Sequence, residues 1–103
     1  SSEGKHTIVL VQFTTAQTSR TFHDFESLND AMDGIVKMYE QKLKQLNPSL
    51  RHITYDINDL FEYIDGLSDL SCLVLNPESC TYVPYGKEWI KSRVFQHLKR
   101  QAQ

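Results

Sequence analysis

Apolar and β-branched residues fill a short segment near the start of the chain. Residues 6–13 read HTIVLVQF, a run that is long enough for a β-strand and too short for a helix. The next residues, 14–21 (TTAQTSRT), are small and polar, as is typical of a mobile loop. The pattern therefore predicts a strand over residues 6–13 and then a loop.

A long amphipathic helix is predicted next, because apolar residues recur at intervals of three and four. These residues are Leu28, Met32, Ile35, Val36, Tyr39, Leu43 and Leu46. Ser27 is expected to cap the N-terminus of the helix, since the acidic residue Asp30 follows it three positions later. Asn47 and Pro48 are expected to end the helix.

The middle of the chain is expected to contribute one strand and one helix. Residues 51–55 (RHITY) have the β-branched and aromatic composition of a short strand. A second helix follows, for which either Asp56 or Asn58 can serve as the cap. Its apolar face is formed by Leu60, Phe61, Ile64 and Leu67.

A hairpin and a last helix are predicted in the final third. Residues 69–75 have the composition of a strand, and the turn residues 76–79 (NPES) predict that residues 80–83 return antiparallel. Pro84 suits the end of an edge strand because it cannot donate to a ladder. Gly86 can cap the last helix, whose apolar positions are Trp89, Ile90, Val94 and Leu98.

The element order is therefore βαβαββα, and we expect an α+β fold with two layers. A four-stranded, mainly antiparallel sheet should carry three amphipathic helices on one face. The length of 103 residues suits one domain, which we place at residues 6–101. Residues 1–5 lack the apolar stretch of a signal peptide and are expected to form a disordered tail.

Two of the predicted strands carry bulky apolar side chains on both faces, whereas three helices on one layer can cover only one face. The set expected on the uncovered face is Ile8, Leu10, Leu73 and Leu75, with His6, Gln12 and Ser71 as a polar rim. Burying four such side chains is worth about 6–12 kcal/mol before the cost of association. These seven residues are therefore the predicted interface of a homodimer, and the alternative is that a segment of the same chain covers them.

The composition narrows the classes of partner. Hydrophobic residues make up 40% of the chain and charged residues 23%, which excludes a disordered chain. The formal net charge of −2 disfavours direct binding of nucleic acid, because binding requires many phosphates to be neutralised. The longest apolar run covers only residues 8–11, far short of the roughly 20 residues of a membrane span. We expect no membrane partner.

The sequence shows no arrangement typical of an enzyme or of a cofactor site. Cys72 and Cys80 form neither a redox pair nor a zinc ligand set, and they favour a reducing compartment. The four histidines lie far apart, and the four glycines make no phosphate-binding loop. We therefore expect no catalysis, no metal and no cofactor.

One alternative function is direct binding of single-stranded RNA. The aromatic residues Tyr82, Tyr85 and Trp89 are able to stack on bases, and the last helix is basic. Its basic residues are Lys87, Lys91, Arg93, Lys99 and Arg100. The structural explanation of the same aromatic residues is that they fix the last helix to the sheet.

Several segments together resemble the enhancer of rudimentary family. They are residues 6–12 (HTIVLVQ), 38–40 (MYE), 53–57 (ITYDI), 69–74 (DLSCLV), 81–85 (TYVPY), 89–91 (WIK) and 100–103 (RQAQ). The resemblance runs from His6 to the end of the chain. The chain departs from the family pattern in residues 14–19 and at Leu75, Val83 and Gly86, of which Leu75 and Val83 point to an altered partner preference.

The resemblance implies a small, non-enzymatic, dimeric adaptor of the nucleus and cytoplasm. Members of that family serve RNA-processing factors, including those that handle small-RNA precursors or eliminate selected messenger RNAs. The dimer binds short, otherwise disordered segments of larger proteins in grooves beside its interface. A further alternative, from the same resemblance, is an accessory subunit linked to pyrimidine metabolism and the cell cycle.

The resemblance also assigns expected roles to individual residues. Ile8 and Leu10 fall at the positions that hold the family dimer together. Thr21 and Ser27 match sites of an acidic-directed kinase, although a helix cap is the simpler role for Ser27. The expected contacts for partner segments are Val83, Tyr85 and Tyr55.

Overall fold

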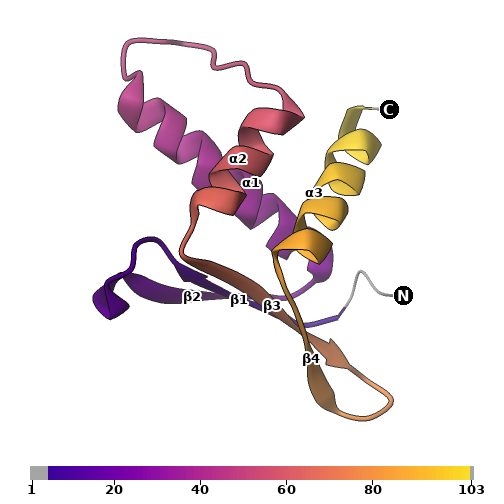
Figure 1. Ribbon diagram of the computed structural model, residues 1–103. Helices are drawn as coiled ribbons and strands as arrows, with labels where there is room; N and C mark the ends of the chain where they lie inside the picture. The colour runs from indigo at the N-terminus through magenta and orange to yellow at the C-terminus, as the bar shows by residue number, and fades with distance from the viewer. Residues whose placement is uncertain (1–4, 103) are drawn as a thin grey trace.

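The computed structural model describes residues 5–102 and has two layers, a sheet below and helices above (Figure 1). The strands are β1 (Thr7–Gln12), β2 (Arg20–Phe25), β3 (Asp69–Asn76) and β4 (Thr81–Tyr85), and the helices are α1 (Leu28–Leu46), α2 (Ile57–Gly66) and α3 (Lys87–Ala102). A single 3₁₀ turn, η2 (Gln17–Ser19), precedes β2. The sheet order is β2-β1-β3-β4, and every neighbouring pair is antiparallel. The predicted α+β architecture is confirmed.

The second strand is not where the sequence pattern placed it. Residues 51–55 form no strand, and the strand that completes the sheet is β2, which begins within the predicted loop at residues 14–21. The element order is therefore ββααββα rather than βαβαββα. Both central strands need partners on each side, and β2 supplies the outer partner of β1 through six residue pairs from Thr7–Phe25 to Gln12–Arg20.

The chain start is described only in part. Residues 1–4 of the predicted tail lie outside the described residues. Lys5 is described, and its carbonyl accepts a hydrogen bond of 3.0 Å from the Thr7 hydroxyl. This bond satisfies Thr7, the one polar residue that is buried in the core among the described residues.

Side-chain caps define where two helices begin. The Ser27 hydroxyl accepts a hydrogen bond of 3.1 Å from the Asp30 backbone N–H, as predicted. Asp56, rather than Asn58, caps α2, and it forms a capping box because the Asp59 carboxylate accepts from the Asp56 backbone N–H. Each cap satisfies N–H groups that a helix leaves unpaired at its first turn.

The core lies between the helices and one face of the sheet. Alternate residues of the central strands are buried there, namely Thr7, Val9 and Val11 of β1 and Leu70, Cys72 and Val74 of β3. They pack against the apolar faces of all three helices, including Met32, Ile35, Leu60, Ile64, Ile90 and Val94. Burial raises the pKa of the Cys72 thiol to about 12, so this thiol stays protonated at neutral pH.

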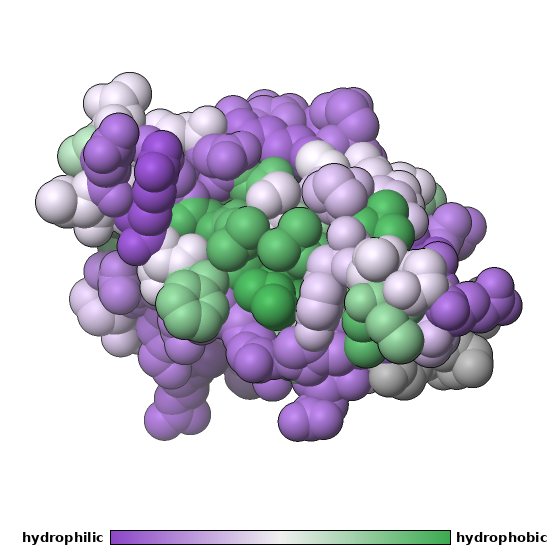
Figure 2. Space-filling view, turned by 90° about the horizontal axis from the view of Figure 1, so that it is seen from below, coloured by the Kyte–Doolittle hydropathy of each residue, from purple (hydrophilic) through white to green (hydrophobic). Residues whose placement is uncertain are grey.

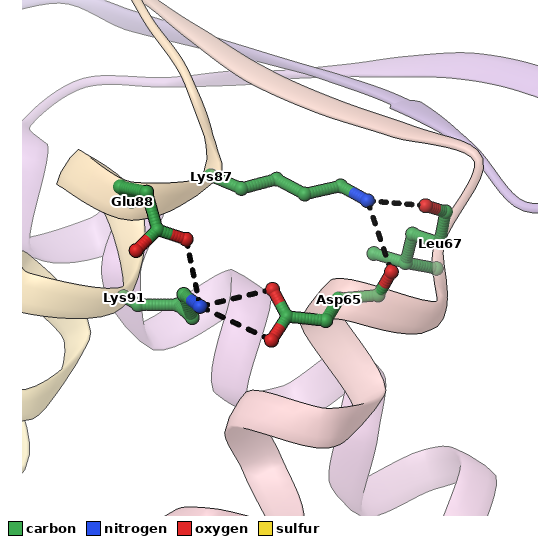
Figure 3. Close-up of polar contacts among 5 residues, drawn as sticks. All are labelled: Asp65, Leu67, Lys87, Glu88 and Lys91. Atoms are coloured by element: carbon green, nitrogen blue, oxygen red, sulfur yellow. Dashed lines mark hydrogen bonds and ion pairs between the residues drawn. The ribbon is translucent and has the colours of Figure 1, made fainter.

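Two lysines join the end of α2 to the start of α3 (Figure 3). The Lys87 ammonium donates hydrogen bonds to the backbone carbonyls of Asp65 and Leu67, which end α2. Lys91 lies between two carboxylates, 2.9 Å from Asp65 and 2.8 Å from Glu88. These contacts fix the two helices side by side above the sheet.

Candidate functional site

The face of the sheet that points away from the helices is left uncovered by residues 5–102, the part of the chain that the structure describes. We call it the open face. It consists of Ile8, Leu10 and Gln12 from β1, Arg20, Phe22 and Asp24 from β2, Asp69, Ser71, Leu73 and Leu75 from β3, and Tyr82 and Pro84 from β4. Viewed from this side, hydrophobic residues gather at the centre and hydrophilic residues surround them (Figure 2).

The four apolar residues predicted for this face do come together. Ile8 is directly opposite Leu73 in the β1–β3 ladder, and Leu75 follows two residues later on the same face. Ile8, Leu73 and Leu75 are half-buried by their neighbours, whereas Leu10 is 37% exposed. The sequence pattern therefore predicted the centre of the face.

Sequence reasoning missed two aromatic residues on the same face. Phe22 lies opposite Leu10 and is 68% exposed, and Tyr82 lies opposite Leu75 and is 41% exposed. Phe22 was missed because β2 was not recognised as a strand. The β-favouring residues Thr21, Phe22 and Phe25 were the available signal.

A polar cluster closes one end of the open face. His6 lies between Asp24 and Tyr82, with its Nε2 bonded to the Asp24 carboxylate and its Nδ1 2.7 Å from the Tyr82 hydroxyl. The rings of His6 and Tyr82 meet edge to face at 5.8 Å. The cluster thus runs across the sheet from β2 to β4.

A second polar group lies at the opposite end. The Arg20 Nε donates a hydrogen bond of 2.7 Å to the Gln12 side-chain oxygen. Ser71 and Asp69 line a shallow hollow of about 250 Å³ beside this pair. The predicted rim residues His6, Gln12 and Ser71 therefore do surround the apolar centre.

The three residues expected to contact partner segments do not share one surface. Val83 and Tyr85 lie on the helix side of β4, where Tyr85 stacks on Trp89 with a centroid distance of 3.9 Å. Tyr55 lies at the other end of α3, in a hollow with Leu98. Its hydroxyl donates a 2.8 Å hydrogen bond to Glu40, and burial together with this bond raises its pKa. Tyr55 therefore has a structural role beside α1.

The two expected phosphorylation positions lie near each other in the sequence and differ in structure. Thr21 is exposed on β2. Ser27 is partly buried and its hydroxyl is engaged as the α1 cap. Phosphorylation of either residue stays a prediction.

Within residues 5–102, no three histidine, cysteine or acidic side chains are placed so that they could hold a metal ion. In the same part of the chain, no helix is long and apolar enough to cross a membrane. The arrangement at the open face offers an apolar contact area with polar ends, which is the composition of a protein–protein interface.

Comparison with known proteins gives one consistent result. The family model described as "Enhancer of rudimentary" matches residues 3–103. The enhancer of rudimentary homolog of Dictyostelium discoideum is 55% identical over 95% of this chain and 98% of its own length. The homolog of Arabidopsis thaliana is 52% identical over 98% of this chain and 93% of its own, and the Drosophila virilis protein is 47% identical over 94% and 93%.

Proposed function

This chain belongs to the enhancer of rudimentary family, and we propose that it is a homodimeric adaptor whose two copies pair through their open faces. One observation carries the proposal. The central strands present Ile8, Leu10, Leu73 and Leu75 on the side opposite to the described helices. A contiguous apolar patch with polar ends favours burial against another protein, and a two-fold pair of identical surfaces is the commonest solution.

The most exposed side chains of the open face gain the most from pairing. Ile8, Leu73 and Leu75 are already half-buried, so they gain less from pairing than fully exposed residues would. Among the large hydrophobic side chains of the open face, Phe22, Tyr82 and Leu10 retain the most exposed area, at 68%, 41% and 37%. A large aromatic ring near the centre of an interface is a common source of binding energy.

The adaptor role requires the dimer to bind other proteins. We propose that it binds short segments of RNA-processing proteins in the nucleus and cytoplasm and performs no catalytic step. A dimer presents each of its grooves twice, so it can bring two such segments together. The relatives share a name that indicates no catalytic activity, which supports a regulatory role.

The charges of α3 support protein segments rather than RNA as partners. Lys87 and Lys91 are engaged with the end of α2 and with Glu88. Arg93 lies over the Trp89 ring at 5.6 Å, and Tyr85 stacks on the same ring. Side chains held in this way offer little to phosphates or bases.

The test places charges in the proposed interface. Ile8→Arg combined with Leu10→Arg is expected to give a folded monomer, because a dimer would bury four arginines, two from each copy, at its interface. The matched control is Leu46→Arg with Leu50→Arg, two exposed leucines outside the sheet. Sedimentation equilibrium should give twice 12.0 kDa for the wild type and the control, and 12.0 kDa for the interface variant. A wild type that stays monomeric, or an interface variant that stays dimeric, contradicts the proposal.

A further inference from the structure

A groove runs along the helix side of β2, between this strand and α1. Its inner part, about 160 Å³, is lined by Val9 and Phe25 from the sheet and by Met38 from α1. Gly34 shapes the groove, since a Cβ at this position would lie 2.5 Å from the Phe25 ring. The missing side chain allows the ring to lie against α1 and form an apolar floor.

The strand beside this groove is an edge strand that contains no proline. The sheet order places β2 at one end, so in the described residues no strand pairs with its outer side. Its six residues, RTFHDF, include neither proline nor lysine. The other edge strand, β4, contains Pro84. Free backbone groups on an edge without proline are able to pair with an added strand.

The mouth of the groove is acidic. A hollow of about 360 Å³ shares Phe25, Gly34 and Lys37 with the inner part of the groove, and acidic residues line it. These residues are Glu26, Asp30 and Asp33, together with Asp24, whose carboxylate is bonded to His6 at the open face. The one lysine there, Lys37, lies 2.9 Å from Asp33, and this contact lowers the pKa of Asp33. An excess of negative charge beside an apolar floor favours a ligand with basic and apolar residues.

We propose that this groove binds an extended, basic segment of a partner protein. The segment pairs with the free edge of β2, places apolar side chains against Phe25 and Met38, and places lysine or arginine beside Glu26 and Asp30. This inference rests on the adaptor function proposed above and specifies the chemistry of the bound segment. RNA is disfavoured at this position because the carboxylates repel phosphates.

The experiment starts from peptide selection on the whole chain. A random dodecapeptide phage library is panned against the immobilised wild-type protein, and the best peptide is synthesised with a fluorescent label. The enriched peptides are expected to combine lysine or arginine with β-branched or aromatic residues. An N-methyl group at alternate peptide nitrogens should abolish binding, because it removes the N–H donors of an added strand. Enriched peptides that are acidic or uncharged, or that bind equally well when methylated, overturn the proposal.

Two charge reversals of equal size locate the bound peptide. Glu26→Lys changes the mouth of the groove, and Glu78→Lys changes the exposed β3–β4 turn at the other edge of the sheet. Fluorescence anisotropy should show a Kd about tenfold higher for Glu26→Lys and within about twofold for Glu78→Lys. Glu26→Gln should give an intermediate value. Equal Kd values for the two lysine variants, or displacement of the peptide by a single-stranded RNA dodecamer, overturn the proposal.

The groove consists of residues from one chain, which separates this test from the test of the dimer. The Ile8→Arg, Leu10→Arg monomer is expected to bind the peptide with a Kd within about threefold of the wild-type value. If the wild type is monomeric but the peptide result holds, only the dimer proposal fails. Association of wild-type dimers into tetramers that the peptide reverses would show that a second copy occupies the edge, and would overturn the partner proposed here.

Discussion

Phe22 illustrates how a single residue acquires its importance from the register of a sheet. In the sequence it is one aromatic residue in a polar stretch, and in the structure it lies opposite Leu10 on the open face. It is 68% exposed, although burying a phenylalanine is worth about 1.5–3 kcal/mol. A side chain of this size, held beside Leu10, is suited to contact a second molecule.

Phe22→Ala is expected to weaken the proposed dimer more than tenfold while the subunit keeps its fold, because the ring makes few contacts within its own chain. Phe95→Ala provides the matched control, since Phe95 is a phenylalanine that is 40% exposed on α3. The dimer dissociation constants from sedimentation equilibrium compare the two variants. A Phe22→Ala dimer as tight as the Phe95→Ala dimer would remove Phe22 from the interface.

At the scale of elements, the helices could be predicted well and one strand could not. The spacing of apolar residues and the end signals predicted a helix with the bounds that α1 has, Leu28–Leu46, because a long amphipathic helix leaves a regular pattern in the sequence. The segment at residues 51–55 has strand composition, but it pairs with no strand. The Tyr55 ring packs on Tyr39, and its hydroxyl donates a hydrogen bond to Glu40. Tertiary packing therefore outweighed β-propensity.

The strand β2 was not predicted because its sequence lacks the pattern of a half-buried strand. Five of its six residues are exposed, so the chain carries no buried–exposed alternation there. Its pairing depends on β1, which needs a neighbour on its outer side. The residues of the candidate site were predictable to the same extent. Leu73 and Leu75 were identifiable from the two-sided apolar pattern of β3, whereas Tyr82 required knowledge of the register.

A prediction at this scale concerns the cap at the start of α1. Ser27→Ala should lower the free energy of unfolding by about 1 kcal/mol, because the Asp30 N–H would lose its acceptor at the helix start. Ser27→Asp should retain the wild-type stability, since a carboxylate can accept the same bond and favours a helix N-terminus. Urea denaturation of both variants measures the difference. Equal destabilisation by alanine and aspartate would show that the cap is not the stabilising contact.

At the scale of the whole molecule, burial in the packed interior raises the pKa of three acidic side chains. Cys72 is buried there with a pKa of about 12 against an ordinary value of 9.0, and burial also raises the pKa of Tyr39 and Tyr63. Each of these groups ionises at a lower pH in the unfolded chain than in the folded protein. Their contribution to stability is therefore complete below pH 9 and is lost as the pH rises toward 12.

The expected result is a stability that falls above pH 9. For Cys72 alone, the slope is about 1.4 kcal/mol per pH unit over this range. The urea midpoint measured from pH 7 to pH 11 should decline more steeply in the wild type than in Cys72→Ala, which lacks this ionisation. Parallel pH profiles for the two proteins would contradict the role assigned to the thiol.

The two edges of the sheet differ, and the difference bears on fibre formation, a hazard of β-proteins. Fibres grow when every copy offers two edges that accept another copy. Pro84 has no N–H to donate on the β4 edge, whereas the β2 edge has no proline. Two copies that met along β2 would turn only their proline-bearing edges outward. Stacking of this kind would end at a closed pair instead of continuing as a filament.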